Sequence, residues 1–477
     1  MRLENLSVLE IVDLIKSKKI SCLELTEYYL GQIEKYKDKN AVLEVFDDAT
    51  TNAKKIDEYI ASNDNLPSLI GVPILIKDNL MYDGKICSCA SKMLEHYVAQ
   101  YNATVIQKLL DAGVVILGRT NMDEFAMGSS CENSAFGNCK NAHDDSKVPG
   151  GSSGGSAVAV ALDMCAFALG SDTGGSVRQP ASYNGVVGLK PTYARISRYG
   201  LVPYASSLDT VGIFSKNVKD NAYILSIIAG RDKNDDTSSR LPVDDYLSHI
   251  YNSISGKKIA VIKEVKEQME KTPYLDIYNS IYDLCRESGA EIIEVSIPEY
   301  SAILSAYYTI AFAEVTSNLG RLDGVRYTSR SEDVKDIDSL FINSRTEFFG
   351  KEVKRRIMLG NFVLSSEYYN AYYVKAKQIA QKLKEQFSEV FESCDLIFMP
   401  TAYGEAFDLG AKTNDPLSMY IEDMFTVPIN VVGVPAISIP CGKGVNGLPL
   451  GLQILAKHFN EKEIYNMADF IISKRGQ

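Results

Sequence analysis

Pro149-Gly150-Gly151-Ser152-Ser153-Gly154-Gly155-Ser156 and Gly170-Ser171-Asp172-Thr173-Gly174-Gly175-Ser176 are two clusters of glycine and serine that flank an expected helix and strand. Between residues 148 and 171 the only charged side chain is Asp163. A tract of small, apolar and glycine-rich residues is expected to be buried. Its buried hydroxyls then need hydrogen-bond partners, and its backbone can present N–H groups to an anion. Either cluster alone is also compatible with tight turns and serine helix caps.

The second cluster carries the sharper chemical signal. Consecutive N–H groups of Thr173, Gly174, Gly175 and Ser176 precede a helix expected over residues 177–183, and such a row of donors can form an oxyanion hole. Ser176 then stands where a nucleophile belongs.

A serine nucleophile needs a base, and the sequence offers one unusual candidate. His143 is the only histidine near the clusters, and its neighbours supply no clear acidic orienter. Lys77 ends the apolar run 72–76, so its ammonium is expected to emerge from a buried strand, where desolvation favours the neutral base. The alternative is a strand-end lysine that reaches out to solvent.

Hydrophobic periodicity outside the clusters indicates an α/β fold. Ser7 with Glu10 and Ser21 with Glu24 form capping-box patterns that open two helices, over residues 8–18 and 22–36. Short apolar runs then alternate with helical segments, and we expect them to form a central mixed β-sheet covered by helices on both faces; the runs are 72–76, 114–117, 165–169, 258–262, 291–295, 395–399 and 436–439.

The pattern predicts one large domain over residues 1–477. Within it we expect an N-terminal helical layer at about 5–60, a core that holds the two clusters at about 65–215, and a helical insertion at about 300–393, where strand patterns give way to long helical ones.

Composition excludes several classes of protein. The 477 residues carry a net charge of −11, which disfavours direct binding of nucleic acid, and only four histidines and no tryptophan, which leaves little for histidine metal sites or stacking platforms. The nine scattered cysteines suit free thiols in a reducing cytoplasm. Residues 1–19 hold seven charged side chains and lack the apolar core of a signal peptide. We therefore expect a cytoplasmic protein without a metal site.

The two clusters, continued by Val177-Arg178-Gln179-Pro180, resemble the signature of the amidase family. Ser176 follows Ser152 by 24 residues, and Ser152 follows Lys77 by 75, which is similar to the family's spacing. The resemblance implies the amidase-signature fold, with Ser176 as nucleophile, Ser152 as a bridging serine after a cis peptide bond, and Lys77 as base. It also implies that Asp172 and Arg178 brace the loop.

A wider resemblance, over about residues 5–470, narrows the family. Residues 118–130, 323–327 and 355–360 are similar to the glutamine-hydrolysing A subunits of tRNA-dependent amidotransferases. This similarity implies a glutamine site made by Tyr307, Arg356, Asp423, Ser129 and Ser130. Arginine can bind the α-carboxylate of glutamine, and aspartate its α-ammonium. Cys131 departs from the pattern, which more often has threonine there; we expect it to be a tolerated small residue.

The same resemblance implies partners. The A subunit forms a heterotrimer with B and C subunits; the B subunit holds mischarged Glu-tRNA(Gln) or Asp-tRNA(Asn) and consumes ATP with Mg²⁺, while the A subunit needs no cofactor. Two other functions compete with this hypothesis. A free-standing amidase would need Lys77, Ser152 and Ser176 but not Arg356 and Asp423. A non-catalytic phosphate-binding module is disfavoured because the chain has no G-x4-G-K-[ST] pattern.

Overall fold

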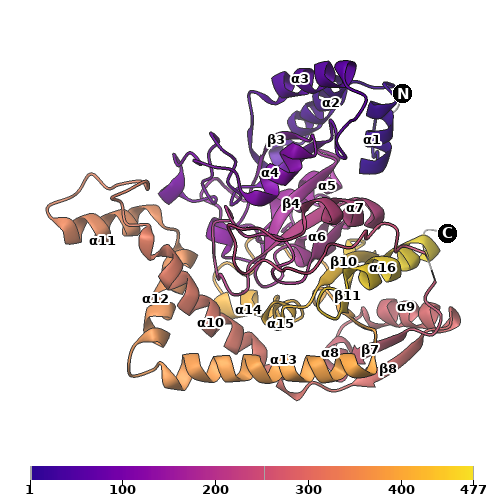
Figure 1. Ribbon diagram of the computed structural model, residues 1–477. Coiled ribbons are helices and arrows are strands. Elements are labelled where there is room, and N and C mark those ends of the chain that lie inside the picture. Colours follow the sequence, from indigo (N-terminus) through magenta and orange to yellow (C-terminus); the bar gives the residue numbers. More distant parts are fainter. Residues whose placement is uncertain (1–2, 252, 476–477) are drawn as a thin grey trace.

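The computed structural model describes residues 3–251 and 253–475, so the few remaining positions of the domain expected over 1–477 lie outside the described residues. A single sheet of eleven strands runs through it, in the order β1-β3-β2-β4-β6-β5-β10-β11-β9-β7-β8 (Figure 1). The strands are β1 (Val42–Val45), β2 (Pro73–Lys77), β3 (Val115–Thr120), β4 (Phe167–Asp172), β5 (Val187–Lys190), β6 (Thr210–Ser215), β7 (Lys258–Ile262), β8 (Glu291–Val295), β9 (Leu396–Pro400), β10 (Ala436–Lys443) and β11 (Pro449–Ala456).

The sheet is mixed, as the sequence predicted. Strands β3, β2 and β4 are parallel to one another, as are β9, β7 and β8, and the strands between these two groups pair antiparallel. Every residue of β2, β3, β4, β6, β9 and β11 is buried. Because side chains alternate between the two faces of a strand, both faces of the sheet must be covered, as predicted.

Helices provide that cover. They are α1 (Val8–Lys16), α2 (Cys22–Lys35), α3 (Ala49–Ser62), α4 (Thr104–Asp111), α5 (Gly154–Ala161), α6 (Arg178–Asn184), α7 (Val218–Ile228), α8 (Lys263–Met269), α9 (Leu275–Glu287), α10 (Ile303–Asn318), α11 (Ile337–Phe348), α12 (Lys351–Leu364), α13 (Lys375–Ser393), α14 (Pro416–Ile421), α15 (Val427–Val432) and α16 (Glu461–Arg475). None of the helices in the described ranges is both long and apolar enough to cross a bilayer.

Local sequence signals account for the first helices. Ser7 and Ser21 each cap a helix in a complete capping box, with Glu10 and Glu24 returning the bond to the cap backbone, so both predicted boxes are confirmed. The seven apolar runs all form strands, whereas β1, β5, β6 and β11 were not predicted.

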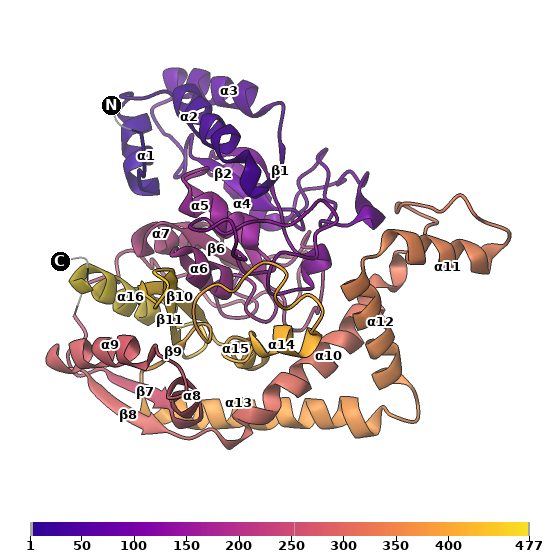
Figure 2. The same ribbon diagram turned by 180° about the vertical axis from the view of Figure 1, so that it is seen from behind.

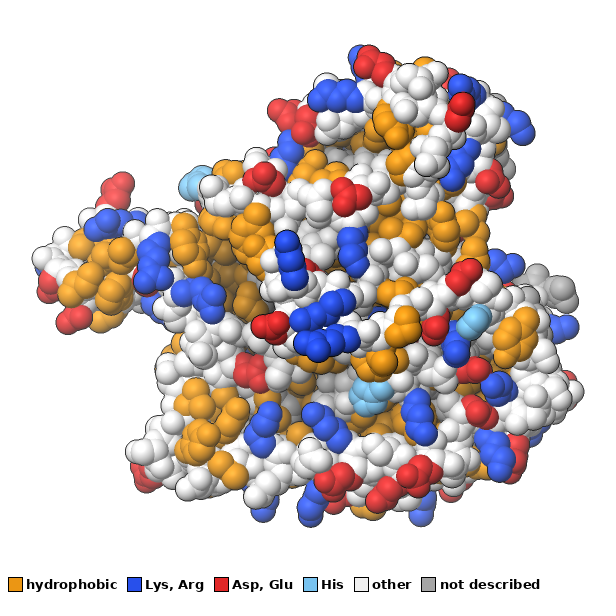
Figure 3. Space-filling model, in the orientation of Figure 1, with side chains coloured by type: hydrophobic (Ala, Val, Ile, Leu, Met, Phe, Trp, Pro, Cys, Tyr) orange, Lys and Arg blue, Asp and Glu red, His pale blue; other side chains and the backbone are white. Residues whose placement is uncertain are grey.

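Helices α10 to α13 fill residues 303–393 and form an arm beside the sheet, from which α11 projects furthest (Figures 1 and 2). Helices α10 and α12 pack so closely that a Cβ at Gly360 would lie 2.0 Å from the backbone oxygen of Phe312. Apolar side chains gather on the projecting part of this arm (Figure 3), where Ile342 and Met358 are 63% and 72% exposed.

Candidate active site

Lys77 is the last residue of β2 and is completely buried. Its Nζ donates to Ser152 Oγ at 2.7 Å and to Ser171 Oγ at 2.9 Å. Burial lowers the pKa of Lys77 to about 7. The strand therefore delivers a lysine that is half neutral near pH 7 and is hydrogen-bonded to the candidate bridging serine, whereas the alternative of a solvent-facing lysine is wrong.

Ser152 lies in the loop between residue 148 and α5, and the tract 148–171 is largely buried, as its composition predicted. The peptide bond between Gly151 and Ser152 is cis, as the family resemblance implied. Glycine is required at 151 because a Cβ there would lie 2.1 Å from Asp123 Oδ2. The Gly151 N–H donates to Gln179 Oε1 at 3.0 Å, so the first cluster is fastened to helix α6.

Ser176 stands just before α6 and is 7% exposed. Its carbonyl oxygen accepts from the Ser153 N–H at 3.2 Å, which joins the two clusters directly. Its hydroxyl makes no hydrogen bond within the described part of the chain. Hydrogen bonds therefore connect Lys77 to Ser152, but none connects Ser152 to the hydroxyl of Ser176. Catalytic hydrogen bonds often tighten only when substrate is bound.

Asp172 organises the loop around Ser176. Its carboxylate accepts from the N–H groups of Gly175 at 2.9 Å and Val177 at 3.1 Å, and from Arg178 Nη2 at 2.9 Å. Burial would raise the pKa of Asp172, but the Arg178 guanidinium holds it well below its usual range. The expectation that Asp172 and Arg178 brace the loop is confirmed.

The predicted oxyanion hole needs one correction. The Gly175 N–H, one of its four expected donors, is committed to Asp172 because the carboxylate reaches back over the turn. The N–H groups of Thr173, Gly174 and Ser176 have no acceptor among the described residues. These three donors precede α6 and are the ones available to an anion.

Arg356 and Asp423 are buried, at 3% and 8% exposure, and neither is a surface ion-pair residue. Asp423 Oδ2 accepts from Ser129 Oγ at 2.8 Å and from Tyr308 OH at 2.6 Å. Burial raises the pKa of Asp423 to about 7. Tyr308 links the two charged groups, since its ring centroid is 5.6 Å from the guanidinium carbon of Arg356.

Tyr307 lies against the loop that precedes Ser176. A Cβ at Gly174 would come within 2.3 Å of its hydroxyl oxygen, so the tyrosine fills the space that glycine leaves open. Ser130 is buried, and its hydroxyl has no hydrogen-bond partner among the described residues. Ser130 and Arg356 both line a cavity of about 400 Å³.

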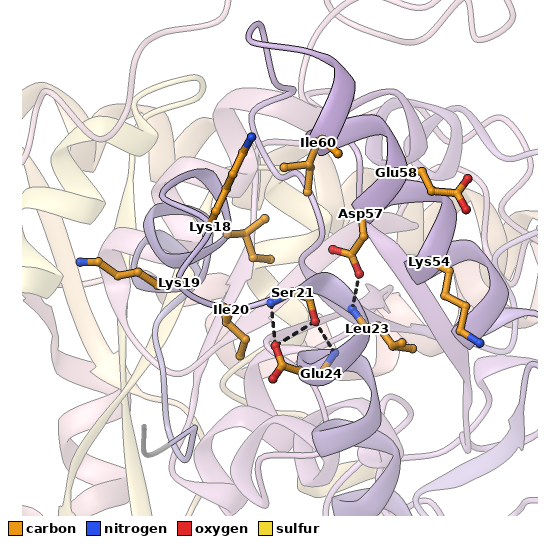
Figure 4. A pocket seen from close by; sticks show the side chains of 12 residues that line it. Lys18, Lys19, Ile20, Ser21, Leu23, Glu24, Lys54, Asp57, Glu58 and Ile60 are labelled. Atoms are coloured by element: carbon orange, nitrogen blue, oxygen red, sulfur yellow. Dashed lines mark hydrogen bonds between the residues drawn. The ribbon is translucent and has the colours of Figure 1, made fainter.

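A second cavity, of about 670 Å³, lies in the N-terminal helical layer between the α1–α2 turn and α3 (Figure 4). Lys18, Lys19 and Lys54 are at this cavity, and no predicted site residue lines it. All nine cysteines are free and buried, Cys131 among them. No cluster of histidine, cysteine and carboxylate side chains suited to a metal ion occurs in the described ranges.

Several neighbours of the site were not predicted. Ser171 Oγ accepts a hydrogen bond from Lys77, and its place in the second glycine-serine cluster was a signal for it. Tyr204, Tyr308 and Tyr420 surround Arg356. Tyr308 adjoins the predicted Tyr307, whereas no local sequence pattern predicts Tyr204 or Tyr420. Glu352 was also missed, although its spacing of four residues before Arg356 on a helix is a recognisable ion-pair pattern.

A mixed sheet with a buried Lys-Ser pair beside a glycine-rich serine loop defines an amidase-type hydrolase site. The amidase family model matches residues 24–465, and the chain belongs to the amidase family. The A subunit of glutamyl-tRNA(Gln) amidotransferase from Thermoanaerobacter pseudethanolicus is 50% identical over 471 residues, covering 98% of this chain and 96% of that protein. The corresponding protein of Caldanaerobacter subterraneus is 49% identical over 478 residues, with the same coverage.

Solved structures agree with the sequence relatives. The crystal structure of the glutamyl-tRNA(Gln) amidotransferase A subunit from Thermotoga maritima matches with a TM-score of 0.82 and 38% identity, over 99% of this chain and 95% of that one. The peptide amidase of Stenotrophomonas maltophilia matches with a TM-score of 0.83 and 26% identity, over 99% and 97%. The predicted amidase-signature fold is confirmed.

Proposed function

We propose that this protein is the glutaminase component of a tRNA-dependent amidotransferase. Two relatives that are 49% and 50% identical to this chain, over 98% of its length, are named as the A subunit of glutamyl-tRNA(Gln) amidotransferase. The observation that carries the chemistry is the buried Lys77 ammonium, 2.7 Å from Ser152 Oγ, beside the loop of Ser176. The product released for the partner protein is ammonia.

In the proposed reaction, Ser176 Oγ attacks the side-chain amide carbon of glutamine. The Ser176 proton passes to Ser152, whose own proton passes to neutral Lys77. The oxyanion is stabilised by the N–H groups of Thr173, Gly174 and Ser176. When the tetrahedral intermediate collapses, the proton returns by the same route to the departing nitrogen, ammonia leaves, and a glutamyl ester remains on Ser176. Water then hydrolyses this ester and gives glutamate.

The residues around Arg356 and Asp423 select glutamine over other amides. Arg356 binds the α-carboxylate, Asp423 binds the α-ammonium, and Tyr307, Ser129 and Ser130 line the same end of the site. A site with buried polar groups discriminates strongly against substrates that leave those groups unpaired. Simple amides are therefore weak substrates in this proposal.

The acceptor of the ammonia lies on other subunits. We place this chain in a cytoplasmic heterotrimer with B and C subunits for protein biosynthesis, in which the B subunit holds mischarged Glu-tRNA(Gln) or Asp-tRNA(Asn) and uses ATP and Mg²⁺ to activate the carboxyl group. The net charge of −11 supports a protein that does not itself hold the tRNA. We also propose that the single domain is divided into an N-terminal helical layer (about 5–60), a core (about 65–215) and a helical insertion (about 300–393).

Three experiments test the proposal. Ser176→Ala should abolish glutamine-dependent ammonia release, and retained activity would remove the nucleophile assignment. Arg356→Ala should impair turnover of glutamine far more than turnover of butyramide, which lacks both α-groups; equal losses would favour a free-standing amidase. Co-purification from the native organism should bring down two other subunits in fixed ratio.

A further inference from the structure

Glu352 is a buried carboxylate that contacts Arg356 and that no step of the proposed reaction uses. It lies on α12 and is 9% exposed. One of its oxygens, Oε1, accepts two hydrogen bonds: from Arg356 Nε at 2.7 Å and from Tyr420 OH at 2.9 Å. The other oxygen, Oε2, pairs with Arg355. Glu352 and these three partners all line the cavity of about 400 Å³.

The two bonds to Oε1 join two separate elements. Arg356 belongs to α12, whereas Tyr420 belongs to α14 and is followed three residues later by Asp423. Tyr308 of α10 adds a third element to this contact. Its hydroxyl donates to Asp423, its ring stacks on Tyr420 with centroids 4.1 Å apart, and its ring centroid lies 5.6 Å from the guanidinium carbon of Arg356. The spacing between the arginine and the aspartate is therefore held by side chains rather than by the backbone.

The bonds also leave the guanidinium partly available. Arginine has five N–H donors. In Arg356, Nε donates to Glu352 and Nη1 donates to Tyr204 OH at 2.8 Å, while aromatic rings surround the guanidinium, with centroids between 5.4 and 6.0 Å away. No hydrogen bond of Nη2 to another described residue is found. Because Arg356 lines the 400 Å³ cavity, its remaining donors can meet a carboxylate there.

We propose that Glu352 is a positioning residue that sets the spacing between Arg356 and Asp423, and thereby makes the site specific for a free α-amino acid. The inference rests on the proposed function. A carboxylate and an ammonium on one α-carbon have a fixed separation, so both are bound well only if their two receptors are held at a matching separation. Displacement by about 1 Å can remove such a two-point grip.

The competing explanation is that Glu352 only neutralises a buried arginine. The two explanations differ for half-substrates. Glutaramic acid keeps the amide and the carboxylate of glutamine but lacks the ammonium, and butyramide lacks both charged groups. If Glu352 sets the spacing, its loss should harm the substrate with two charged groups more than the substrate with one. If it only pairs with Arg356, both should suffer equally.

The experiment measures kcat and KM by ammonia release for the three amides. Glu352→Ala should raise the KM for glutamine by roughly 10–100-fold and change kcat little; kcat/KM should fall at least about tenfold more for glutamine than for glutaramic acid, with butyramide turnover retained. Glu352→Gln keeps an oxygen that can accept both bonds and should restore most of the glutamine KM. Glu347→Ala removes an exposed glutamate from α11 and should match the unaltered protein.

Equal losses for glutamine and glutaramic acid would overturn the spacing role, and so would a Glu352→Ala protein that behaves like Glu347→Ala. If Glu352→Ala does not fold, Tyr420→Phe decides, because it removes only the hydroxyl bonded to Oε1; a KM for glutamine unchanged in this variant would also overturn the inference. Failure of the proposed function is recognised separately, since the unaltered protein would then release no ammonia from glutamine.

Discussion

The two buried groups with shifted pKa values, Lys77 and Asp423, give a prediction for the pH dependence of glutamine hydrolysis. In the proposed reaction Lys77 acts as a base only when neutral, and burial lowers its pKa to about 7. The proposed binding of the α-ammonium by Asp423 requires an ionised carboxylate, and burial raises the pKa of Asp423 to about 7. Both groups must therefore lose a proton as the pH rises through about 7. Acid lowers activity in two ways, because it protonates Lys77 and also protonates Asp423.

The size of the effect follows from these pKa values. At pH 7 a lysine with its ordinary pKa of 10.5 is neutral in only about one molecule in 3,000, whereas about half of Lys77 is neutral, a gain of about 10³-fold. Below pH 7 the logarithm of kcat/KM should rise by about two per pH unit for glutamine, and by about one for butyramide, which needs Lys77 but not Asp423. At pH 5 the two substrates should be about 10⁴-fold and 10²-fold below their plateaus.

The assay is ammonia release between pH 5 and pH 8.5 at substrate concentrations well below KM, because kcat/KM reports the titration of the free enzyme. Recovery of activity at pH 8 after incubation at pH 5 controls for unfolding. Asp423→Asn should bring the glutamine slope down to about one. If glutamine and butyramide gave the same slope, the role of Asp423 would be refuted. If the kcat/KM for butyramide did not fall as the pH drops below about 7, the role of Lys77 would be refuted.

The remaining predictions concern stability. Gly31 and Gly360 both lie inside helices, but a Cβ at Gly31 meets nothing within 4 Å whereas one at Gly360 meets a backbone oxygen of α10 at 2.0 Å. Gly31→Ala should stabilise the fold by about 0.5–1 kcal/mol and Gly360→Ala should destabilise it by more than about 2 kcal/mol, as measured by urea unfolding; a similar effect of both would contradict the packing argument. Arg178→Met leaves the buried Asp172 carboxylate unpaired and should cost roughly 3–5 kcal/mol in the same assay, and a loss below about 1 kcal/mol would mean that the pair is replaceable.

The sequence predicted the parts of the fold whose signals are local. The apolar run 72–76 is bounded by Gly71 and Lys77, and the capping boxes of α1 and α2 are each complete within four residues. Strand β11 has an apolar run that is interrupted by Gly451 and Gln453, and β5 contains a glycine and a lysine in four residues, so neither has a clear strand pattern. Their place in the sheet is decided by long-range pairing with β10.

The candidate site divides in the same way. Ser152 and Ser176 are marked by glycine-rich motifs, and Lys77 stands at the end of a recognisable strand. The contacts around Arg356 could not be predicted, because Tyr204 reaches it from 152 residues away and Tyr420 comes from a short helix beyond the arm. The commitment of the Gly175 N–H to Asp172 depends on the exact course of a turn, which residue types alone do not determine.

The arm and the core supply different parts of the candidate site, and this division bears on how the protein's specificity can change. Lys77, Ser152 and Ser176 come from the strands and loops of the core, whereas Tyr307 and Arg356 come from α10 and α12. The two parts meet at Gly174 in the loop before Ser176, where a Cβ would lie 2.3 Å from the hydroxyl oxygen of Tyr307. Exchange of residues 303–364 for those of another amidase should therefore alter two of the side chains proposed to bind the substrate and leave Lys77, Ser152 and Ser176 unchanged. Substrate range can then evolve, or be engineered, with the proposed reacting groups kept.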